Sequence, residues 1–344
     1  MLGLVTEPGR AHSARVEEVQ EPAVSAGELP IRVLEVGVCG TDREIAHGLF
    51  GIAPEGQPTL IIGHELLGVV DADGEGFGRG DLVAATVRRS CGHCLACAED
   101  SPDSCLTGDY SERGITRLHG FAREVVSESA AQLVPVPSTL GRLGVLGEPT
   151  SICTRALRHA RAIGGRQPWQ LQRALVIGGG AIGLLTTILL RLDGVDVVTA
   201  SLEPSNDLVA AVGASYVSTA DTSVSDLGMF DLVVEAAGNA QLMAESVSHL
   251  RRSGVACLLG IDGRDQQVQL DGPVIGVDMV LENRVLFGSV NAHRRDWLAG
   301  VASLDRARER WQDVLEELVG LRVPLDRFAE AFDFRRGKAT LVLS

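Results

Sequence analysis

The sequence predicts an α/β protein with a doubly wound parallel sheet in its central part. The first observation is a short apolar strand at 174–177 that runs directly into a glycine-rich turn and a helical stretch. The second is a series of apolar strand segments, separated by helical segments, at 195–199, 215–217, 231–236 and 255–259. Strands that alternate with helices in this way form a parallel sheet. Because 344 residues exceed what one hydrophobic core usually holds, we expect two domains.

The glycine-rich turn at 178–183 has the pattern G-x-G-x-x-G, which is typical of a dinucleotide-binding Rossmann fold. Gly178 permits the tight turn, Gly180 lets the backbone approach a pyrophosphate, and Gly183 allows the helix to pack closely on the strand. The helix that opens at Ala181 and Ile182 would hold the phosphates at its N-terminus. The alternative is a glycine-rich turn in the core of some other α/β domain, but the regular alternation of strands and helices favours dinucleotide binding.

The choice between NAD and NADP depends on the residue about 20 positions beyond the last glycine. Glu203 occupies this position, and no arginine or lysine stands beside it. A carboxylate binds the ribose 2′-hydroxyl of NAD, whereas an arginine accommodates the 2′-phosphate of NADP. NAD is therefore favoured, with NADP as the other candidate, unless Glu203 is only a solvated carboxylate of a loop.

Four cysteines form the most specific motif of the chain, with the spacing C-x2-C-x2-C-x7-C. They are Cys91, Cys94, Cys97 and Cys105. One short loop with four thiolates suits a structural, tetrahedral zinc ion. A zinc ribbon fits less well, because its two C-x2-C pairs stand about 15–20 residues apart. An iron–sulfur cluster also takes four cysteines, and only the remainder of the chain argues against it.

The net charge of −14 opposes a broad attraction to nucleic acids or anionic membranes. The longest largely apolar run, Ala181–Leu190, is about half of the ~20 residues that a membrane-spanning helix needs. No signal-peptide pattern occurs near the start of the sequence. We therefore expect a cytoplasmic protein without nucleic-acid or membrane partners, whose seven cysteines stay reduced.

A third group of residues is spread over the first half of the chain. Cys39 offers a thiolate, His64 an imidazole, and Glu65 and Glu148 offer carboxylates. Each of these residues alone is ordinary and could be structural. Together they have the mixed sulfur, nitrogen and oxygen composition of an open catalytic zinc site, in which water or substrate takes the remaining position. The sequence thus predicts two zinc ions per chain.

These segments, in this order, resemble the zinc-dependent medium-chain alcohol dehydrogenase superfamily, and several resemble its glucose (aldose) 1-dehydrogenase branch. The segments that carry the resemblance are 38–45, 60–65, 86–89, 111–115, 119–121, 147–149 and 288–291, together with the cysteine loop. The resemblance implies a β-rich, GroES-like catalytic domain over residues 1–150 and 291–344 that contains both zinc sites. It implies a Rossmann domain over residues 151–290.

The resemblance also implies roles for individual residues. Cys39, His64 and Glu148 would hold the catalytic zinc, with Glu65 as an extra or exchanging ligand. Asp42 would orient His64, and Thr41 would relay the substrate proton. The residues that would contact the sugar are Glu112 and Asn291, with Arg88, Arg89 and His293 as further candidates. Family members are usually tetramers or dimers, so a homo-oligomer is expected.

The implied reaction is the oxidation of an aldose, such as D-glucose, at C1 to the aldonolactone, with hydride transfer to NAD(P). Branch members that use NADP have arginine where this chain has Ser201 and Leu202, which again favours NAD. A zinc-dependent polyol or secondary-alcohol dehydrogenase with the same machinery is the nearer alternative. A catalytically silent NAD-binding protein with a purely structural zinc ion is the more distant one.

Overall fold

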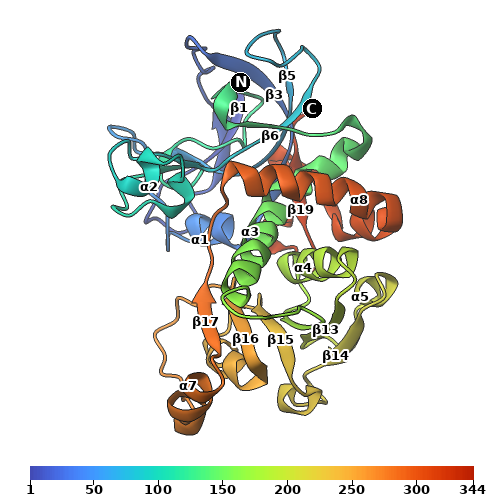
Figure 1. The fold of residues 1–344 in the computed structure, drawn as a ribbon. Helices are drawn as coiled ribbons and strands as arrows, with labels where there is room; N and C mark the ends of the chain where they lie inside the picture. Colours follow the sequence, from blue (N-terminus) through green and yellow to red (C-terminus); the bar gives the residue numbers. More distant parts are fainter. The chain divides into compact units, whose positions relative to one another are not determined.

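A computed structural model describes residues 1–344, except for the side chain of Ser225. The chain divides into two compact units (Figure 1). The first unit contains Met1–Ser151, Asn291–Asp305 and Leu315–Ser344, and the second contains Ile152–Val290 and Arg306–Val314. Two helices contribute residues to both units, α3 (Gly147–Gly164) and α8 (Arg294–Leu318).

The first unit is built on a seven-stranded sheet with the order β11-β6-β5-β3-β19-β18, in which β10 also pairs with β3. The strands are β3 (Glu28–Val38), β5 (Glu65–Val70), β6 (Leu82–Ala85), β10 (Val125–Ser129), β11 (Leu133–Pro135), β18 (Leu321–Pro324) and β19 (Ala339–Val342). The long strand β3 pairs antiparallel with β5, β10 and β19. It therefore joins segments from the beginning and the end of the chain.

Two three-stranded sheets complete the first unit. The first contains β1 (Leu2–Thr6), β2 (Arg15–Glu18) and β4 (Leu60–Ile61), and the second contains β7 (Arg88–Arg89), β8 (Ser111–Arg113) and β9 (Arg117–Leu118). The short α-helices of this unit are α1 (Gly40–Ala46), α2 (Leu95–Ala98) and α9 (Phe328–Asp333). Its 3₁₀ helices are Pro102–Ser104, Ala130–Gln132, Ser138–Leu146 and Leu325–Arg327.

The second unit contains a six-stranded sheet with the order β14-β13-β12-β15-β16-β17, and every neighbouring pair is parallel. Its strands are β12 (Arg173–Ile177), β13 (Asp196–Ser201), β14 (Ser215–Ser218), β15 (Phe230–Glu235), β16 (Leu250–Leu258) and β17 (Val285–Gly288). Its helices are α4 (Ala181–Leu192), α5 (Asp207–Ala211), α6 (Ala240–Glu245) and α7 (Met279–Leu281). Further turns of 3₁₀ or π helix are Val224–Leu227, Ser246–His249 and Val274–Asp278. The predicted parallel sheet is confirmed, and β17 is a strand that the sequence did not predict.

The central parallel strands form around short runs of apolar residues in β12 and β15. Leu175, Val176, Val233 and Val234 are all fully buried, although neighbours along a strand point to opposite faces of the sheet. Such runs are typical of a parallel sheet that is covered on both faces. Burial of each of these side chains contributes about 1.5–3 kcal/mol to the stability of the unit. Over the part of the chain that is described, no helix combines the length and the apolar character that membrane crossing requires.

Candidate active site

Three of the predicted metal ligands converge in the first unit. Cys39 follows β3, whereas His64 precedes β5 and Glu65 is the first residue of that strand. The antiparallel register aligns Gly37 with Glu65 and so brings the two strand ends together. One ligand atom of each residue lies within 4.8 Å of the others, and His64 Nε2 is 3.2 Å from Cys39 Sγ. A half-buried thiol, a buried imidazole and a buried carboxylate thus face one another.

The backbone around Cys39 is shaped to hold this arrangement. A Cβ atom at Gly37 would lie 1.9 Å from Glu65 Oε2, so only glycine leaves room for the carboxylate. At the start of α1, the Thr41 backbone N–H donates to Cys39 Sγ over 3.2 Å. The Cys39 backbone N–H donates to Asp42 Oδ2 over 2.9 Å. This capping box fixes the thiol and the Asp42 carboxylate relative to each other.

Asp42 lies behind His64. Its Oδ1 is 3.3 Å from His64 Nδ1, and both side chains are buried. Burial opposes charge on both groups, but their mutual attraction lowers the pKa of Asp42, and Cys39 and Asp42 raise the pKa of His64 well above its usual range. A carboxylate at Nδ1 leaves Nε2 directed toward Cys39, as in sites where a second residue orients a histidine ligand.

Glu148 lies in the first turn of α3 and is buried, although it is not in the group of three whose atoms lie within 4.8 Å. Burial, followed by the negative charge of Glu65, raises the pKa of Glu148 to about 7. Glu65 Oε2 is also buried and has no hydrogen-bond partner. Two buried carboxylates that repel each other beside a thiol and an imidazole fit a bound cation, and this set of ligand atoms suits zinc.

Lys338 is a residue of this cluster that the sequence motifs did not identify. It precedes β19, is 4% exposed, and donates from Nζ to Glu65 Oε1 over 2.6 Å. Burial opposes its charge, but Glu65 and Cys39 raise its pKa, which favours the ammonium form. One signal was present in the sequence, because Lys338 is the only lysine in a chain with 31 basic residues. Its partner lies 273 positions away, which no local pattern reveals.

The four cysteines of the loop around α2 also converge. Their sulfur atoms all lie within 4.8 Å of one another, and Cys94 Sγ is 3.9 Å from Cys105 Sγ. The backbone N–H groups of Cys97 and Leu106 each donate to Cys94 Sγ over 3.5 Å. All four are free thiols, so the loop has the donors for one tetrahedral ion.

Three of the predicted sugar-contact residues meet in a buried cluster. Arg88 on β7 is aligned with Glu112 on β8, and Arg88 Nε donates to Glu112 Oε1 over 2.9 Å. Asn291 Nδ2 donates to the same oxygen, also over 2.9 Å. The Arg88 guanidinium lies 3.8 Å from the centre of the Tyr110 ring. The cluster presents an acceptor flanked by two donors, which suits recognition of hydroxyl groups.

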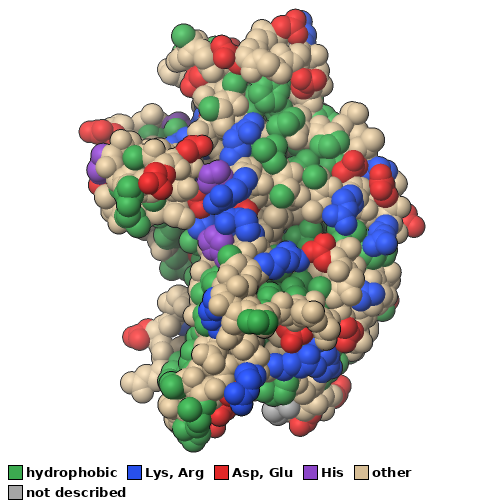
Figure 2. Space-filling model, viewed as in Figure 1, with side chains coloured by type: hydrophobic (Ala, Val, Ile, Leu, Met, Phe, Trp, Pro, Cys, Tyr) green, Lys and Arg blue, Asp and Glu red, His purple; other side chains and the backbone are tan. Residues whose placement is uncertain are grey.

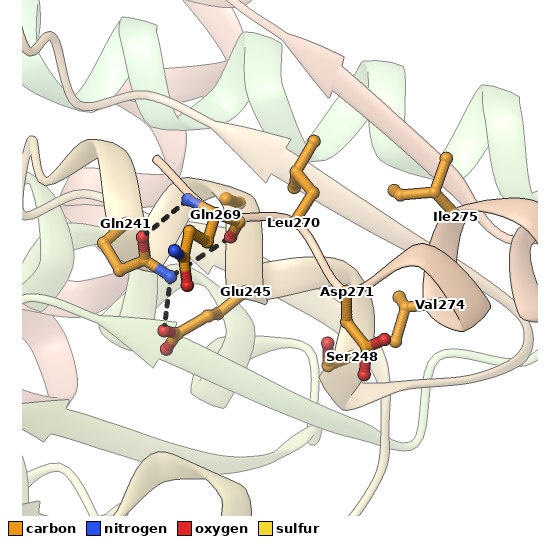
Figure 3. A pocket seen from close by; sticks show the side chains of 9 residues that line it. Gln241, Glu245, Ser248, Gln269, Leu270, Asp271, Val274 and Ile275 are labelled. Atoms are coloured by element: carbon orange, nitrogen blue, oxygen red, sulfur yellow. Dashed lines mark hydrogen bonds between the residues drawn. The ribbon is translucent and has the colours of Figure 1, made fainter. Parts of the chain in front are cut away.

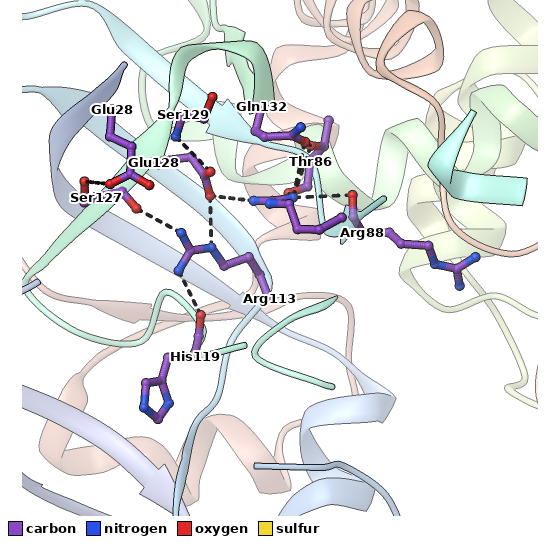
Figure 4. A network of polar contacts seen from close by, with 10 residues as sticks. Glu28, Thr86, Arg88, Arg113, His119, Ser127, Glu128, Ser129 and Gln132 are labelled. Carbon is purple, nitrogen blue, oxygen red and sulfur yellow. Dashed lines mark hydrogen bonds and ion pairs between the residues drawn. The ribbon is translucent and has the colours of Figure 1, made fainter. Parts of the chain in front are cut away.

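The other two candidates are placed differently. Arg89 donates from Nη2 to Glu128 and from Nη1 to the Thr86 carbonyl. Glu128 and Thr86 belong to the polar network that Figure 4 draws. His293 caps α8, with Nδ1 accepting from the backbone of Arg295. Together with Arg88 it lines a cavity of about 320 Å³. Arg89 is therefore tied to the interior of the unit, whereas His293 and Arg88 share a cavity wall.

The glycine turn of the second unit lies between β12 and α4, as its motif predicts. Gly178 has φ +113°, and a Cβ atom there would lie 2.9 Å from the Ala236 carbonyl carbon. A Cβ atom at Gly183 would lie 1.9 Å from the Gly178 oxygen, so both glycines are required by the chain's own backbone. At Gly180, by contrast, a Cβ atom would meet nothing within 4 Å. This open space beside the N-terminus of α4 fits a bound pyrophosphate.

A cavity of about 910 Å³ extends from this turn. Residues 178–180 line it together with Glu203, which follows β13, whereas Ala181 and Ile182 open α4 and do not line it. The Ser201 hydroxyl donates to the Glu203 carboxylate, and Tyr216 Oη donates to the Glu203 carbonyl over 2.7 Å. Arg264 is a further lining residue that the sequence did not indicate, and it is paired with Asp262 at 2.7 Å.

Another hollow of the second unit, about 280 Å³, lies between α6 and the segment 269–275 (Figure 3). The Gln241 side chain spans its wall, because it donates to Glu245 and to the Gln269 carbonyl and accepts from the Gln269 backbone N–H. These polar groups satisfy one another. None of the predicted site residues lines this hollow.

Comparison with known proteins places both units in one family. Residues 25–138 match the family described as alcohol dehydrogenase GroES-like domain, and residues 141–344 match glucose dehydrogenase C-terminus. The second match covers more than half of the chain. This chain belongs to the glucose dehydrogenase family of zinc-dependent medium-chain dehydrogenases. The resemblance inferred from the sequence is confirmed, and so is the fold class of a Rossmann sheet with a GroES-like domain.

The similarity to individual members extends over the full length. Glucose 1-dehydrogenase of Methanocella arvoryzae is 38% identical over 96% of this chain and 95% of its own. Glucose 1-dehydrogenase 1 of Caldivirga maquilingensis is 38% identical over 100% of this chain and 98% of its own. The solved glucose dehydrogenase of Haloferax mediterranei, in complex with NADP, Zn and gluconolactone, has a TM-score of 0.92 at 33% identity and covers 100% of this chain and 99% of its own.

Replacement of Lys338 by methionine is expected to destabilise the metal-free protein by about 3–5 kcal/mol, because Glu65 is left as an unpaired buried charge. Added zinc should recover part of this loss. The free energy of unfolding, measured with and without zinc, tests this. The control is Arg327→Met, which breaks the exposed ion pair with Glu330 and should change stability by about 0.5 kcal/mol or less. If the two substitutions lower the free energy of unfolding equally, Lys338 does not compensate a buried charge at Glu65.

Alanine substitutions in the glycine turn should separate folding from binding. Gly183→Ala is expected to destabilise the second unit by about 1–3 kcal/mol, because the new methyl group overlaps the Gly178 carbonyl. Gly180→Ala should leave thermal unfolding nearly unchanged and weaken dinucleotide binding, measured by titration calorimetry. Undiminished binding by Gly180→Ala would exclude the turn as the pyrophosphate site.

Proposed function

We propose that this chain oxidises an aldose, such as D-glucose, at C1 to the aldonolactone and transfers the hydride to a nicotinamide dinucleotide. The catalytic zinc is held by Cys39, His64 and Glu148, with Glu65 as an extra ligand. The observation that carries the proposal is the similarity, over the full length, to the Haloferax glucose dehydrogenase that contains NADP, Zn and gluconolactone. The convergence of Cys39, His64 and Glu65 in this chain supports it.

Bound zinc would supply a Lewis acid that lowers the pKa of the anomeric hydroxyl, and the nicotinamide would supply the hydride acceptor. The residues of the chain do the remaining work. The Thr41 hydroxyl passes the departing proton outward, and Asp42 keeps the His64 ring oriented through its contact at Nδ1. The substrate loses a proton from O1 and a hydride from C1, which leaves the lactone carbonyl.

Recognition of the sugar is assigned to Glu112 and Asn291, assisted by Arg88 and by His293 on the wall of the adjoining cavity. Glu112 accepts hydrogen bonds, whereas Asn291 and Arg88 donate them, so neighbouring sugar hydroxyls find partners of both kinds. All three side chains are buried. A wrong epimer leaves one buried group unpaired, which discriminates strongly between sugars.

NAD is proposed as the preferred cofactor. The cavity of the second unit has Ser201, Leu202 and Glu203 on its wall, where a 2′-phosphate would need a cation and instead meets a carboxylate. Arg264, the cation that does line this cavity, is already neutralised by Asp262. The Haloferax relative was solved with NADP, so the cofactor must be tested directly.

We also propose two zinc ions per chain, the second one held by Cys91, Cys94, Cys97 and Cys105, within a catalytic domain of residues 1–150 and 291–344. All seven cysteines are free thiols, which suits a reducing compartment such as the cytoplasm. A homo-oligomer is proposed from the family alone. Metal analysis and size-exclusion chromatography with light scattering address these points.

The zinc-loaded protein is expected to reduce NAD with D-glucose or a similar aldose, and to do so faster than with sorbitol or a simple secondary alcohol. The measurement is nicotinamide reduction with NAD and NADP in parallel, alongside zinc content per chain. Turnover confined to polyols or simple alcohols would keep the machinery and overturn the sugar assignment. A single zinc ion and no turnover would favour a catalytically silent protein.

Substitution Glu203→Ala is expected to raise KM for NAD roughly tenfold, because a hydrogen bond from the ribose to a charged group is lost. KM for NADP should change little or fall. The matched control is Asp207→Ala, which removes an exposed carboxylate of the same unit that does not line the cavity. Unchanged kinetics with NAD would reduce Glu203 to a solvated loop carboxylate.

A further inference from the structure

Glu128 is a buried carboxylate that the proposed reaction does not use. It lies on β10, is 3% exposed, and accepts hydrogen bonds from two arginines at the same oxygen (Figure 4). Arg89 Nη2 lies 2.5 Å and Arg113 Nε lies 2.9 Å from Glu128 Oε2. Glu128 Oε1 accepts from the backbone N–H of Ser129 over 2.9 Å. Its contacts are thus satisfied within the interior of the unit.

The two arginines are the immediate neighbours of the sugar-contact residues. Arg89 follows Arg88 on β7, and Arg113 follows Glu112 on β8, with Arg88 and Glu112 aligned across the pair. Because successive residues of a strand point to opposite faces, Arg88 and Glu112 share one face and the two neighbours share the other. Glu128 therefore binds both strands from behind the Arg88–Glu112 pair.

The remaining hydrogen bonds of the two arginines go mostly to backbone carbonyls, and Arg89 Nη1 also donates to the Gln132 side chain over 3.3 Å and to the Thr86 hydroxyl over 3.4 Å. Arg89 Nη1 donates to the Thr86 carbonyl over 2.7 Å. Arg113 Nη2 donates to the Ser127 carbonyl over 2.9 Å, and its Nη1 donates to the His119 carbonyl over 3.1 Å. Since β10 pairs with the central strand β3, Glu128 connects the small sheet β7-β8-β9 to the large sheet. Through Arg89 and Arg113, Glu128 holds both β7 and β8 of the small sheet.

The charges make this connection depend on one carboxylate. Arg89 and Arg113 are close enough to repel each other, and burial together with Arg113 lowers the pKa of Arg89. Glu128 is the group that offsets this repulsion. A neutral side chain at the same place would leave the buried guanidinium of Arg113 and the half-buried one of Arg89 without their shared partner, and would let β7 and β8 move apart.

We infer that Glu128 is a positioning residue for sugar recognition: by holding Arg89 and Arg113, it sets where Arg88 and Glu112 stand relative to the substrate. The inference rests on the proposed function, because it concerns the same sugar-contact cluster. It assigns Arg89 to this support and not to direct contact with the sugar. A displacement of the cluster should weaken the binding of the sugar and its discrimination more than the chemical step.

The test is Glu128→Gln in the full-length, zinc-loaded protein. KM for the aldose should rise roughly tenfold, whereas kcat, KM for the dinucleotide and zinc content should stay within about twofold. The preference for glucose over galactose and xylose, taken from kcat/KM, should decrease. Glu128→Asp keeps the charge and therefore the fold, but its shorter side chain reaches the arginines less well, so a smaller rise in KM is expected.

The matched control is Glu28→Gln. Glu28 belongs to the same network and accepts a hydrogen bond from the Ser127 hydroxyl over 2.7 Å, but it binds neither arginine. The Glu28→Gln variant should therefore keep the KM for the aldose and the sugar preference of the parent protein. Glu112→Gln provides the reference for direct contact and should raise KM for the aldose. If Glu112→Gln raises KM while both Glu128 variants leave KM and sugar preference unchanged, the positioning inference is wrong. If Glu112→Gln has no effect, the assignment of Glu112 to sugar contact is wrong and the positioning inference fails with it, whereas the proposed reaction is decided separately by turnover of aldoses against polyols.

Discussion

Buried carboxylates of the first unit each need a cationic partner, and these partners come from distant segments of the chain. Glu35 is fully buried on β3 and is paired with Arg142 and Arg322 at 2.6 and 3.3 Å. Glu65 depends in the same way on Lys338. Each pair joins residues that are far apart in sequence, and each lies on or beside the central strand β3. An unpaired buried charge costs several kcal/mol. Strand pairings that bring each carboxylate to its cation are therefore stabilised over pairings that leave it alone.

The two candidate binding regions illustrate two ways in which a fold makes room for a ligand. In the glycine turn, Gly178 and Gly183 are needed because a side chain there would overlap neighbouring backbone atoms, whereas Gly180 borders space that the protein does not fill. In the metal cluster, by contrast, the space is bounded by groups that oppose one another, because Glu65 and Glu148 are carboxylates in a region of low exposure. The glycine turn would bind a dinucleotide because it leaves space for one. The metal cluster would bind a cation because a positive charge offsets the repulsion between its carboxylates.

The fold was predictable where its signals are local. The strand before the glycine turn, the turn itself and the four-cysteine loop each lie within a short window, and the structure has all three where the sequence places them. Strand β17 was missed because its four residues lack a distinctive pattern. The opposite facing of Arg88 and Arg89 follows from register, and the role of Lys338 follows from a contact across 273 positions. Neither of these two features is encoded in a local spacing, so the sequence alone could not supply them.

The solitary lysine gives this protein an unusual surface chemistry. All other basic side chains among the 344 residues are arginines or histidines, and Lys338 is enclosed beside Glu65. Reagents that acylate amines therefore find no exposed lysine side chain on the folded chain. Attachment chemistry, crosslinking and enzymatic tagging that depend on lysine would all bypass its surface. Acylation at Lys338 would instead record each occasion on which the interior around β3 opens to solvent.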